Sequence, residues 1–193
     1  MHGSRTRLFG RRRALVATGA LAAALLASAC SSAAVPLEKA TAAGAHAVEF
    51  TSEPALTGKP VFTLTGKGLD DRFPKGLVLD MAALEALPLV SVRIDDPWEK
   101  RKVTYRGVMM NELMRAIDPA GATKMRITAL DDYVVTVQMK DLMSGEVLLA
   151  TTAEGKRMAV ADGGPTRLIL LPKSVVGKST DMWIWSISEM ALE

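Results

Sequence analysis

The chain is predicted to fold as a single α+β domain that consists mostly of short β-strands, with two short helices. Apolar or alternating segments of about four to eight residues recur from Leu56 to the C-terminus, and turn-forming residues separate them, which is typical of strands. Two segments carry helical spacing or a helix N-cap. Residues 30–193 make up 164 of the 193 residues, a length that suits one domain with a sizeable core.

The first 29 residues have the composition of a signal peptide. Residues 1–13 contain five arginines and no acidic residue, and residues 14–29 form an apolar run of 16 residues rich in Ala, Leu and Val. Such a run is too short to span a bilayer comfortably, and it follows the charged region in the order found in secretory leaders. The mature protein is therefore expected to be exported to the periplasm.

Cys30, the only cysteine, stands directly after this leader. The residues before it, Leu26 to Ala29, resemble a bacterial lipobox, in which the cysteine is acylated after cleavage, so we expect a membrane-anchored lipoprotein. The same residues contain Ala27-Ser28-Ala29, which fits an ordinary signal-peptidase site, and this alternative stays open. The stretch Arg11 to Leu15 matches a twin-arginine signal only in part, so the choice between general secretory and twin-arginine export is open as well.

Residue counts exclude several classes of chemistry. With Cys30 used by the leader, the predicted domain has no thiol, and therefore no disulfide, thiolate nucleophile or soft metal ligand. The histidines are His2, in the leader, and His46, in a stretch rich in Ala, Thr and Gly. Ser-His-Asp catalysis, Cys-His catalysis and a usual zinc site are thereby excluded. Removal of residues 1–29 leaves 19 basic and 21 acidic residues, a balance that does not favour a nucleic-acid partner.

The first half of the mature chain contains a tether and both predicted helices. Residues 30–55 are rich in Ala, Ser, Thr and Gly, so they are predicted to be a flexible tether before a domain at residues 56–193. Gly107 is expected to open the second helix, in which apolar residues recur at helical spacing until Asp118-Pro119. The predicted elements are a strand at Val61–Thr65, a helix at Met81–Leu87 with Asp80 as N-cap and Pro88 as stop, strands at Leu89–Ile94 and Val103–Tyr105, and a helix at Val108–Ile117.

The second half is predicted to contain strands separated by turns. Asp131-Asp132 favours a hairpin between two strands, and Asp162-Gly163-Gly164-Pro165 favours a turn. Residues 183–192 alternate in polarity, which predicts a final strand with one wetter face. The predicted strands are Lys124–Leu130, Tyr133–Met139, Val147–Thr152, Met158–Ala161, Arg167–Leu171 and Trp183–Leu192.

Seven short motifs in this order resemble the oxidoreductase molybdopterin-binding domain, which has the sulfite-oxidase-type fold. The resemblance covers nearly all of residues 56–193 and implies a mixed β-sheet or barrel-like arrangement. The motifs are Leu84 to Pro88, the strand Val90 to Ile94, Tyr105-Arg106-Gly107-Val108 with its helix, Ala129 to Tyr133, Leu149-Ala150 with the Gly155 turn, Asp162 to Leu168, and Trp183 to Ile187.

The chain departs from this family at the metal site. Enzymatic members place a molybdenum-binding cysteine just after the strand that corresponds to Val90–Ile94, whereas this chain continues Asp95-Asp96-Pro97-Trp98. A hard carboxylate such as Asp95 does not reproduce the electron donation of a thiolate. The histidine that such members often carry before the Gly-x-Pro turn is replaced by Asp162. The resemblance therefore implies that the fold is kept and the redox metal site is lost, and it leaves open whether the protein is an enzyme.

The ligand-facing loops of the family still carry groups suited to a pterin, a flat polar bicycle that needs an aromatic platform and hydrogen-bonding partners. Each residue also has a structural alternative. Trp98 and Trp183 could pack on the core, Asp132 could only shape its hairpin, and Tyr133 could tie down a loop. Asp162 could cap a turn, and Arg167 could form an internal salt bridge. The resemblance implies a ligand site at Trp98, Asp132, Tyr133, Asp162, Arg167 and Trp183.

The interpretation that follows is an exported protein that binds a molybdenum-free pterin without metal chemistry. Small exported relatives without the cysteine resemble pterin-binding modules, some of which serve a membrane-bound signalling protein, so a membrane receptor is the expected partner. One alternative is a molybdopterin-dependent oxidoreductase with a non-cysteine metal ligand. The other is a ligand-free interaction module that contacts a membrane protein through the Trp98 loop.

Overall fold

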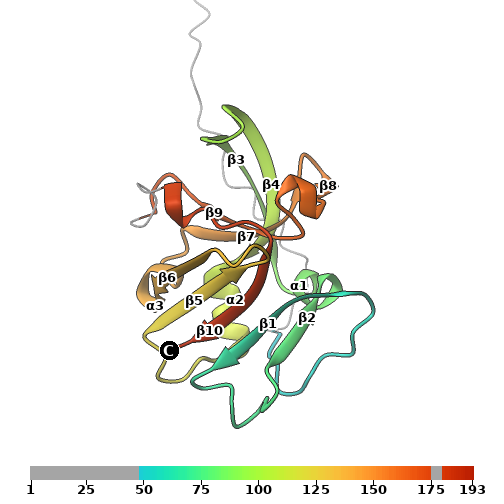
Figure 1. Cartoon of the computed structure of the whole chain (residues 1–193), viewed down its shortest axis with the longest axis vertical. Helices are drawn as coiled ribbons and strands as arrows, with labels where there is room; N and C mark the ends of the chain where they lie inside the picture. The colour runs from blue at the N-terminus through green and yellow to red at the C-terminus, as the bar shows by residue number, and fades with distance from the viewer. Residues whose placement is uncertain (1–47, 175–179) are drawn as a thin grey trace, which may run out of the picture. The chain divides into compact units, whose positions relative to one another are not determined.

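Ten β-strands in two five-stranded sheets form most of the folded unit within residues 48–174 and 180–193, the part of the chain that this computed structural model describes (Figure 1). The predicted signal peptide, Cys30 and most of the predicted tether lie outside the described residues. Phe50, at the end of the predicted tether, is buried in the core, and its N–H donates to the carbonyl of Ala116. The domain start at residue 56 stays a prediction. No helix within the described residues is long and apolar enough to cross a membrane.

The first sheet has the strand order β2-β1-β10-β5-β6. Its only parallel pair joins β1 to β10, near the two ends of the described chain, and its other pairs are antiparallel. β10 thus lies between an N-terminal and a central strand, as Figure 1 shows. The strands are β1 (Pro60–Gly66), β2 (Leu77–Asp80), β5 (Lys124–Ala129), β6 (Val134–Gln138) and β10 (Ile187–Leu192).

The second sheet is antiparallel, with the order β3-β4-β7-β8, and β9 also pairs with β7. Gly107 lies at a register shift between β4 and β7, where a Cβ atom would come within 2.0 Å of the carbonyl oxygen of Leu149. Only glycine allows the two backbones to approach this closely. The strands are β3 (Leu89–Asp96), β4 (Arg101–Met109), β7 (Val147–Ala153), β8 (Lys156–Arg157) and β9 (Arg167–Leu170).

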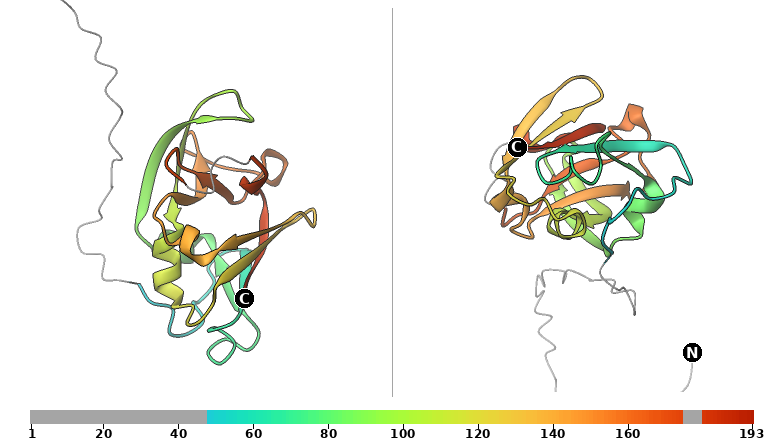
Figure 2. Two further views of the ribbon diagram at one scale, coloured as in Figure 1. Left: turned by 90° about the vertical axis from the view of Figure 1, so that its left-hand side faces the viewer. Right: turned by 90° about the horizontal axis from the view of Figure 1, so that it is seen from below.

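Apolar side chains cover both faces of the second sheet. The larger core cluster joins the first sheet, the helices and residues such as Leu149, whereas Leu148 and Tyr105 belong to a second cluster on the other face. The helices are short, and α2 contacts β4 and β7 (Figure 2). They are α1 (Met81–Glu85), α2 (Met110–Ile117) and α3 (Met139–Leu142), with 3₁₀ turns at Val160–Asp162 and Thr180–Met182. The second cluster borders the site described below.

Most predicted strands and both predicted helices are present, but several details were wrong. Both sheets are open within the described residues, so the barrel-like arrangement is not found. Gly107 lies in β4 rather than at the start of a helix, and Met158–Ala161 is not a strand. The final strand begins at Ile187 rather than Trp183, because Ser186 has a φ of 49° and interrupts the extended backbone. Three short elements, β2, β8 and α3, were not predicted from the sequence.

Asp80 was expected to cap a helix, and it does so while also holding a loop. Its Oδ1 accepts from the N–H of Ala83 at 2.8 Å, and its Oδ2 accepts from the N–H groups of Thr57 at 2.7 Å and Gly58 at 2.8 Å. These donors, Ala83 foremost, outweigh the effect of burial and lower the pKa of Asp80 to about 2.

We expect stability to depend on this carboxylate. Its pKa lies below the value of about 3.9 for an unfolded aspartate, so its contribution is present above about pH 4 and is lost as the pH falls towards 2. Asp80→Asn removes the acceptor for Thr57 and Gly58. Its melting temperature should be below that of the wild type at pH 7, and the gap should close between pH 4 and pH 2 in thermal melts. A gap independent of pH would contradict this role.

Candidate functional site

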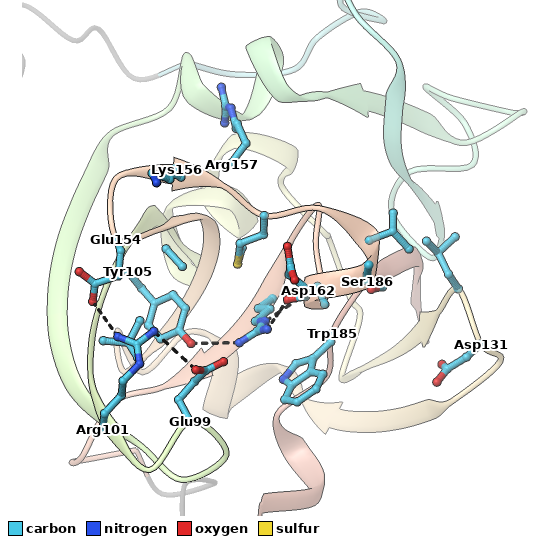
Figure 3. Close-up of a pocket in the computed structure, with 18 residues that line it drawn as sticks. Glu99, Arg101, Tyr105, Asp131, Glu154, Lys156, Arg157, Asp162, Trp185 and Ser186 are labelled. Carbon is cyan, nitrogen blue, oxygen red and sulfur yellow. Dashed lines mark hydrogen bonds and ion pairs between the residues drawn. The ribbon is translucent and has the colours of Figure 1, made fainter.

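Two adjoining cavities open beside the second sheet. The larger has a volume of about 880 Å³, and Figure 3 shows its side chains converging from β4, the β7–β8 hairpin, the turn before β9 and the segment before β10. The smaller has a volume of about 320 Å³. Asp131 and Trp185 line both. The two cavities therefore share a wall.

A buried polar network forms the floor of the larger cavity. Arg167 is only 5% exposed, and its guanidinium donates to the Tyr105 hydroxyl at 3.1 Å and to the carbonyls of Asp162 and Gly163. The Tyr105 hydroxyl donates in turn to Oδ2 of buried Asp96 at 2.6 Å. Burial, and then the bond to Asp96, raise the pKa of the Tyr105 phenol, so it stays protonated and can act as this donor.

Local structure brings these three groups together. Asp96 ends β3, and its Oδ1 accepts from the N–H groups of Trp98 and Glu99, both at 2.8 Å, which fixes the β3–β4 turn. Gly163 precedes Arg167 with a φ of 74°, and a Cβ atom there would lie 2.9 Å from the guanidinium. The glycine therefore leaves room for the Arg167 side chain to fold back under its own turn.

Trp185 covers the guanidinium from the other side. The Cζ of Arg167 lies 4.5 Å from the centre of the Trp185 ring, a cation–π contact, and the backbones of the two residues form an isolated β-bridge. Trp98 meets Trp185 edge-to-face with ring centroids 5.6 Å apart. The indole of Trp185 therefore forms the wall between the two cavities.

Charged side chains surround the larger cavity (Figure 3). Arg101 lies 3.5 Å from a carboxylate oxygen of Glu99 and 3.6 Å from one of Glu154. Both terminal guanidinium N–H groups of Arg157 donate to the carboxylate of Glu85, which forms a bidentate ion pair. Partial burial alone would raise the pKa of Glu85, but the ion pair has the larger effect, so the pKa is lowered. The cavity thus offers both donors and acceptors.

The smaller cavity is mostly aromatic. Its lining combines three tryptophans and a tyrosine with two carboxylates: Trp98, Ala129, Asp131, Tyr133, Thr180, Asp181, Trp183 and Trp185. The hydroxyl of Tyr133 donates to the carbonyl of Asp181 at 3.0 Å. This bond joins the β5–β6 hairpin to the 3₁₀ turn at Thr180–Met182.

The predicted ligand residues are divided between the two cavities. Asp162 and Arg167 line the larger, while Trp98, Tyr133 and Trp183 line the smaller. Asp132, at the tip of the β5–β6 turn with a φ of 65°, lines neither. Trp183 also packs against both core clusters. The ligand roles of all six residues stay predictions.

Sequence reasoning missed the residues that connect these parts. Tyr105 was expected only as part of a short strand and Asp96 only as part of a loop. Trp183 was a predicted site residue, whereas Trp185, which lines both cavities, was not. Arg101, Lys156 and Arg157 were not among the predicted site residues, although all three line the larger cavity. A buried arginine needs nearby acceptors, and this requirement was the one signal that pointed to partners for Arg167.

The residues present do not fit a molybdenum site of the thiolate type. Asp95, the candidate non-cysteine ligand, is exposed and pairs with Lys102 at 3.1 Å on the hairpin, outside both cavities. Asp96 already accepts three hydrogen bonds. Residues 48–174 and 180–193 contain no group of three or more His, Cys, Asp or Glu side chains that could hold a metal ion.

Comparisons with known proteins confirm the resemblance inferred from the motif order. A family model described as "Oxidoreductase molybdopterin binding domain" matches residues 69–191. The sulfane dehydrogenase SoxCD from Paracoccus pantotrophus has a similar structure, with a TM-score of 0.53 and 18% identity, over 77% of this chain and 45% of that chain. The present chain thus spans less than half of that chain, and the likeness supports a sulfite-oxidase-like fold. No curated protein matches the chain.

The buried network makes a testable contribution to stability. Tyr105→Phe should lower the free energy of unfolding by about 1–3 kcal/mol, because it leaves Oδ2 of Asp96 and one donor of Arg167 without their shared partner. Tyr133→Phe is the matched control: its hydroxyl bond is exposed, and the loss should stay within about 0.5 kcal/mol. Urea unfolding measures both, and equal losses would contradict the network.

Proposed function

Because the chain belongs to the oxidoreductase molybdopterin binding domain family, we propose that it binds a pterin in its larger cavity. The observation that carries this proposal is the convergence of an indole, a buried guanidinium and exposed carboxylate and ammonium groups on one cavity. A volume of about 880 Å³ exceeds what a two-ring pterin fills and leaves room for a substituent.

Asp162 is the residue best suited to recognise the pterin edge. Its side chain is exposed at the cavity, while its carbonyl holds Arg167. A carboxylate can accept parallel hydrogen bonds from the amino-pyrimidinone edge, and the indole of Trp185, which lines the same cavity, can support the flat ring. Lys156, which lines the same cavity, can donate to oxygen atoms of a substituent.

The proposed ligand is free of molybdenum. Oxo-molybdenum chemistry in enzymatic relatives depends on a soft thiolate, and the position after β3 is occupied here by carboxylates that are exposed or already hydrogen-bonded. The family match by itself supports molybdopterin as a possible ligand, so the metal content is a matter for direct measurement.

The proposal extends to the place and purpose of binding. The leader and Cys30 favour an exported, acylated protein that presents its pterin to the periplasmic domain of a membrane signalling receptor. An acyl anchor would confine both proteins to one surface and so raise their effective concentration.

The ligand can be identified directly. Protein exported by its native host is denatured, and the released small molecules are separated with fluorescence detection and mass spectrometry, with elemental analysis of the same sample. A fluorescent pterin without stoichiometric molybdenum is expected. Molybdenum with a dithiolene pterin would favour the oxidoreductase, and the absence of any pterin would contradict the proposed function.

Two aspartates provide a matched test of the site. Asp162→Asn should weaken pterin binding at least tenfold, since hydrogen bonds to a charged group contribute about 1.5–3 kcal/mol. Asp71→Asn, at an exposed aspartate that lines neither cavity, is the control and should leave the affinity unchanged. Isothermal titration calorimetry with the identified pterin compares the two variants. An unchanged affinity in Asp162→Asn would contradict the role given to this carboxylate.

A further inference from the structure

The smaller cavity gathers nearly all the tryptophan and tyrosine side chains of the protein. The sequence contains three tryptophans and two tyrosines, and all three tryptophans and Tyr133 line this one cavity. Trp183 packs partly on the core, but core packing does not account for Trp98 and Tyr133, which are 50% and 46% exposed. Exposed aromatic rings around a shared hollow are typical of a binding site.

The charges around this cavity favour a positively charged ligand. Among the residues that the structure describes, its lining contains no lysine or arginine, and Asp131 contributes an exposed carboxylate. Within the described ranges, the arginines that stack on rings lie over Phe73 and Trp185, and none lies over Trp98, Trp183 or Tyr133. The face of an aromatic ring carries negative potential and attracts cations, most strongly for tryptophan.

Arg167 does not oppose such a ligand directly. Its guanidinium lines the larger cavity and not the smaller one, and the Trp185 indole that it stacks on lines both. The fixed positive charge therefore lies on the larger-cavity side of this wall. Asp131 is exposed and lines the smaller cavity, on the side of the Trp185 ring away from the guanidinium. Its carboxylate can therefore offset the charge of a bound cation.

The aromatic lining also indicates which kind of cation fits. A primary ammonium would lose its hydrogen bonds to water, and the ring faces offer few acceptors to replace them. A quaternary ammonium has no N–H to satisfy, and its methyl groups can pack against indole rings while the charge meets their faces. The volume of about 320 Å³ limits the occupant to a compact molecule.

We propose that the smaller cavity is an aromatic cage for a compact quaternary ammonium ligand of the choline type. Trp98, Trp183 and Tyr133 surround the methyl groups, and Asp131 balances the charge. This site is separate from the proposed pterin site, although Trp185 and Asp131 line both cavities. It is argued from the cavity and its charges, and it does not depend on pterin binding.

The first test compares two molecules of nearly the same shape. The full chain is titrated with choline chloride and with the uncharged isostere 3,3-dimethylbutan-1-ol, with potassium chloride as the ionic control. Every tryptophan lines the cage, so intrinsic tryptophan fluorescence reports on it. Choline should bind saturably and about tenfold or more tightly than the isostere, because only choline makes cation–π contacts. Equal binding of the two, or the same response to potassium chloride, would overturn the proposal.

The second test uses matched variants and calorimetry. Trp98→Ala removes a half-exposed ring and should weaken choline binding about tenfold, whereas Val134→Ala, an exposed apolar change that touches neither cavity, should not alter it. Equal affinities for both variants would overturn the cage. Competitive displacement of choline by the pterin would overturn it too, since the cavity would then be part of the pterin site. Choline binding without any pterin binding would support the cage while the proposed function fails.

Discussion

Burial of the Arg167 guanidinium is the constraint on which the rest of the site depends. A buried guanidinium must have its N–H groups satisfied and its charge balanced, or it destabilises the fold. Within the described residues Arg167 makes no direct ion pair. Its N–H groups donate to two carbonyls of its own turn and to the hydroxyl of Tyr105, and the guanidinium stacks on the ring of Trp185. Segments distant in sequence are thereby held around one side chain.

The balancing negative charge lies one step away, at Asp96. This carboxylate accepts from the Tyr105 hydroxyl and, through its other oxygen, from the N–H groups of Trp98 and Glu99. The same group therefore balances the arginine and shapes the hairpin that carries Trp98. A continuous chain of hydrogen bonds thus links the Arg167 side chain, which lines the larger cavity, to the backbone of Trp98, whose ring lines the smaller one.

Sequence reasoning succeeded where the signal was local and failed where it depended on distant contacts. Asp80 before an apolar run and Asp131-Asp132 between two alternating segments identified a capped helix and a hairpin, both of which are present. The alternation at residues 183–192 gave no sign that Ser186 would take a positive φ. The β-bridge beside it joins Trp185 to Arg167, which are 18 positions apart in the chain, so it has no local signal. The same limit hid Tyr105: its burial and partners come from two other segments. Gly107 was assigned to a helix start because its closeness to β7 has no local signature.

The two cavities share Asp131 and Trp185, so a ligand in one cavity can affect binding in the other. Four basic and four acidic side chains line the larger cavity, whereas the described lining of the smaller one is aromatic, with Asp131 and without lysine or arginine. The smaller cavity is therefore the better suited of the two to a cation. A cation held at Asp131 would lower the negative potential in the neighbouring cavity, which favours an anionic or electron-rich ligand there. Thermodynamic linkage requires the reverse effect to be equal, so occupation of either cavity would raise affinity at the other. Such coupling through one indole and one carboxylate would let a domain of this fold respond to two small molecules without a metal centre.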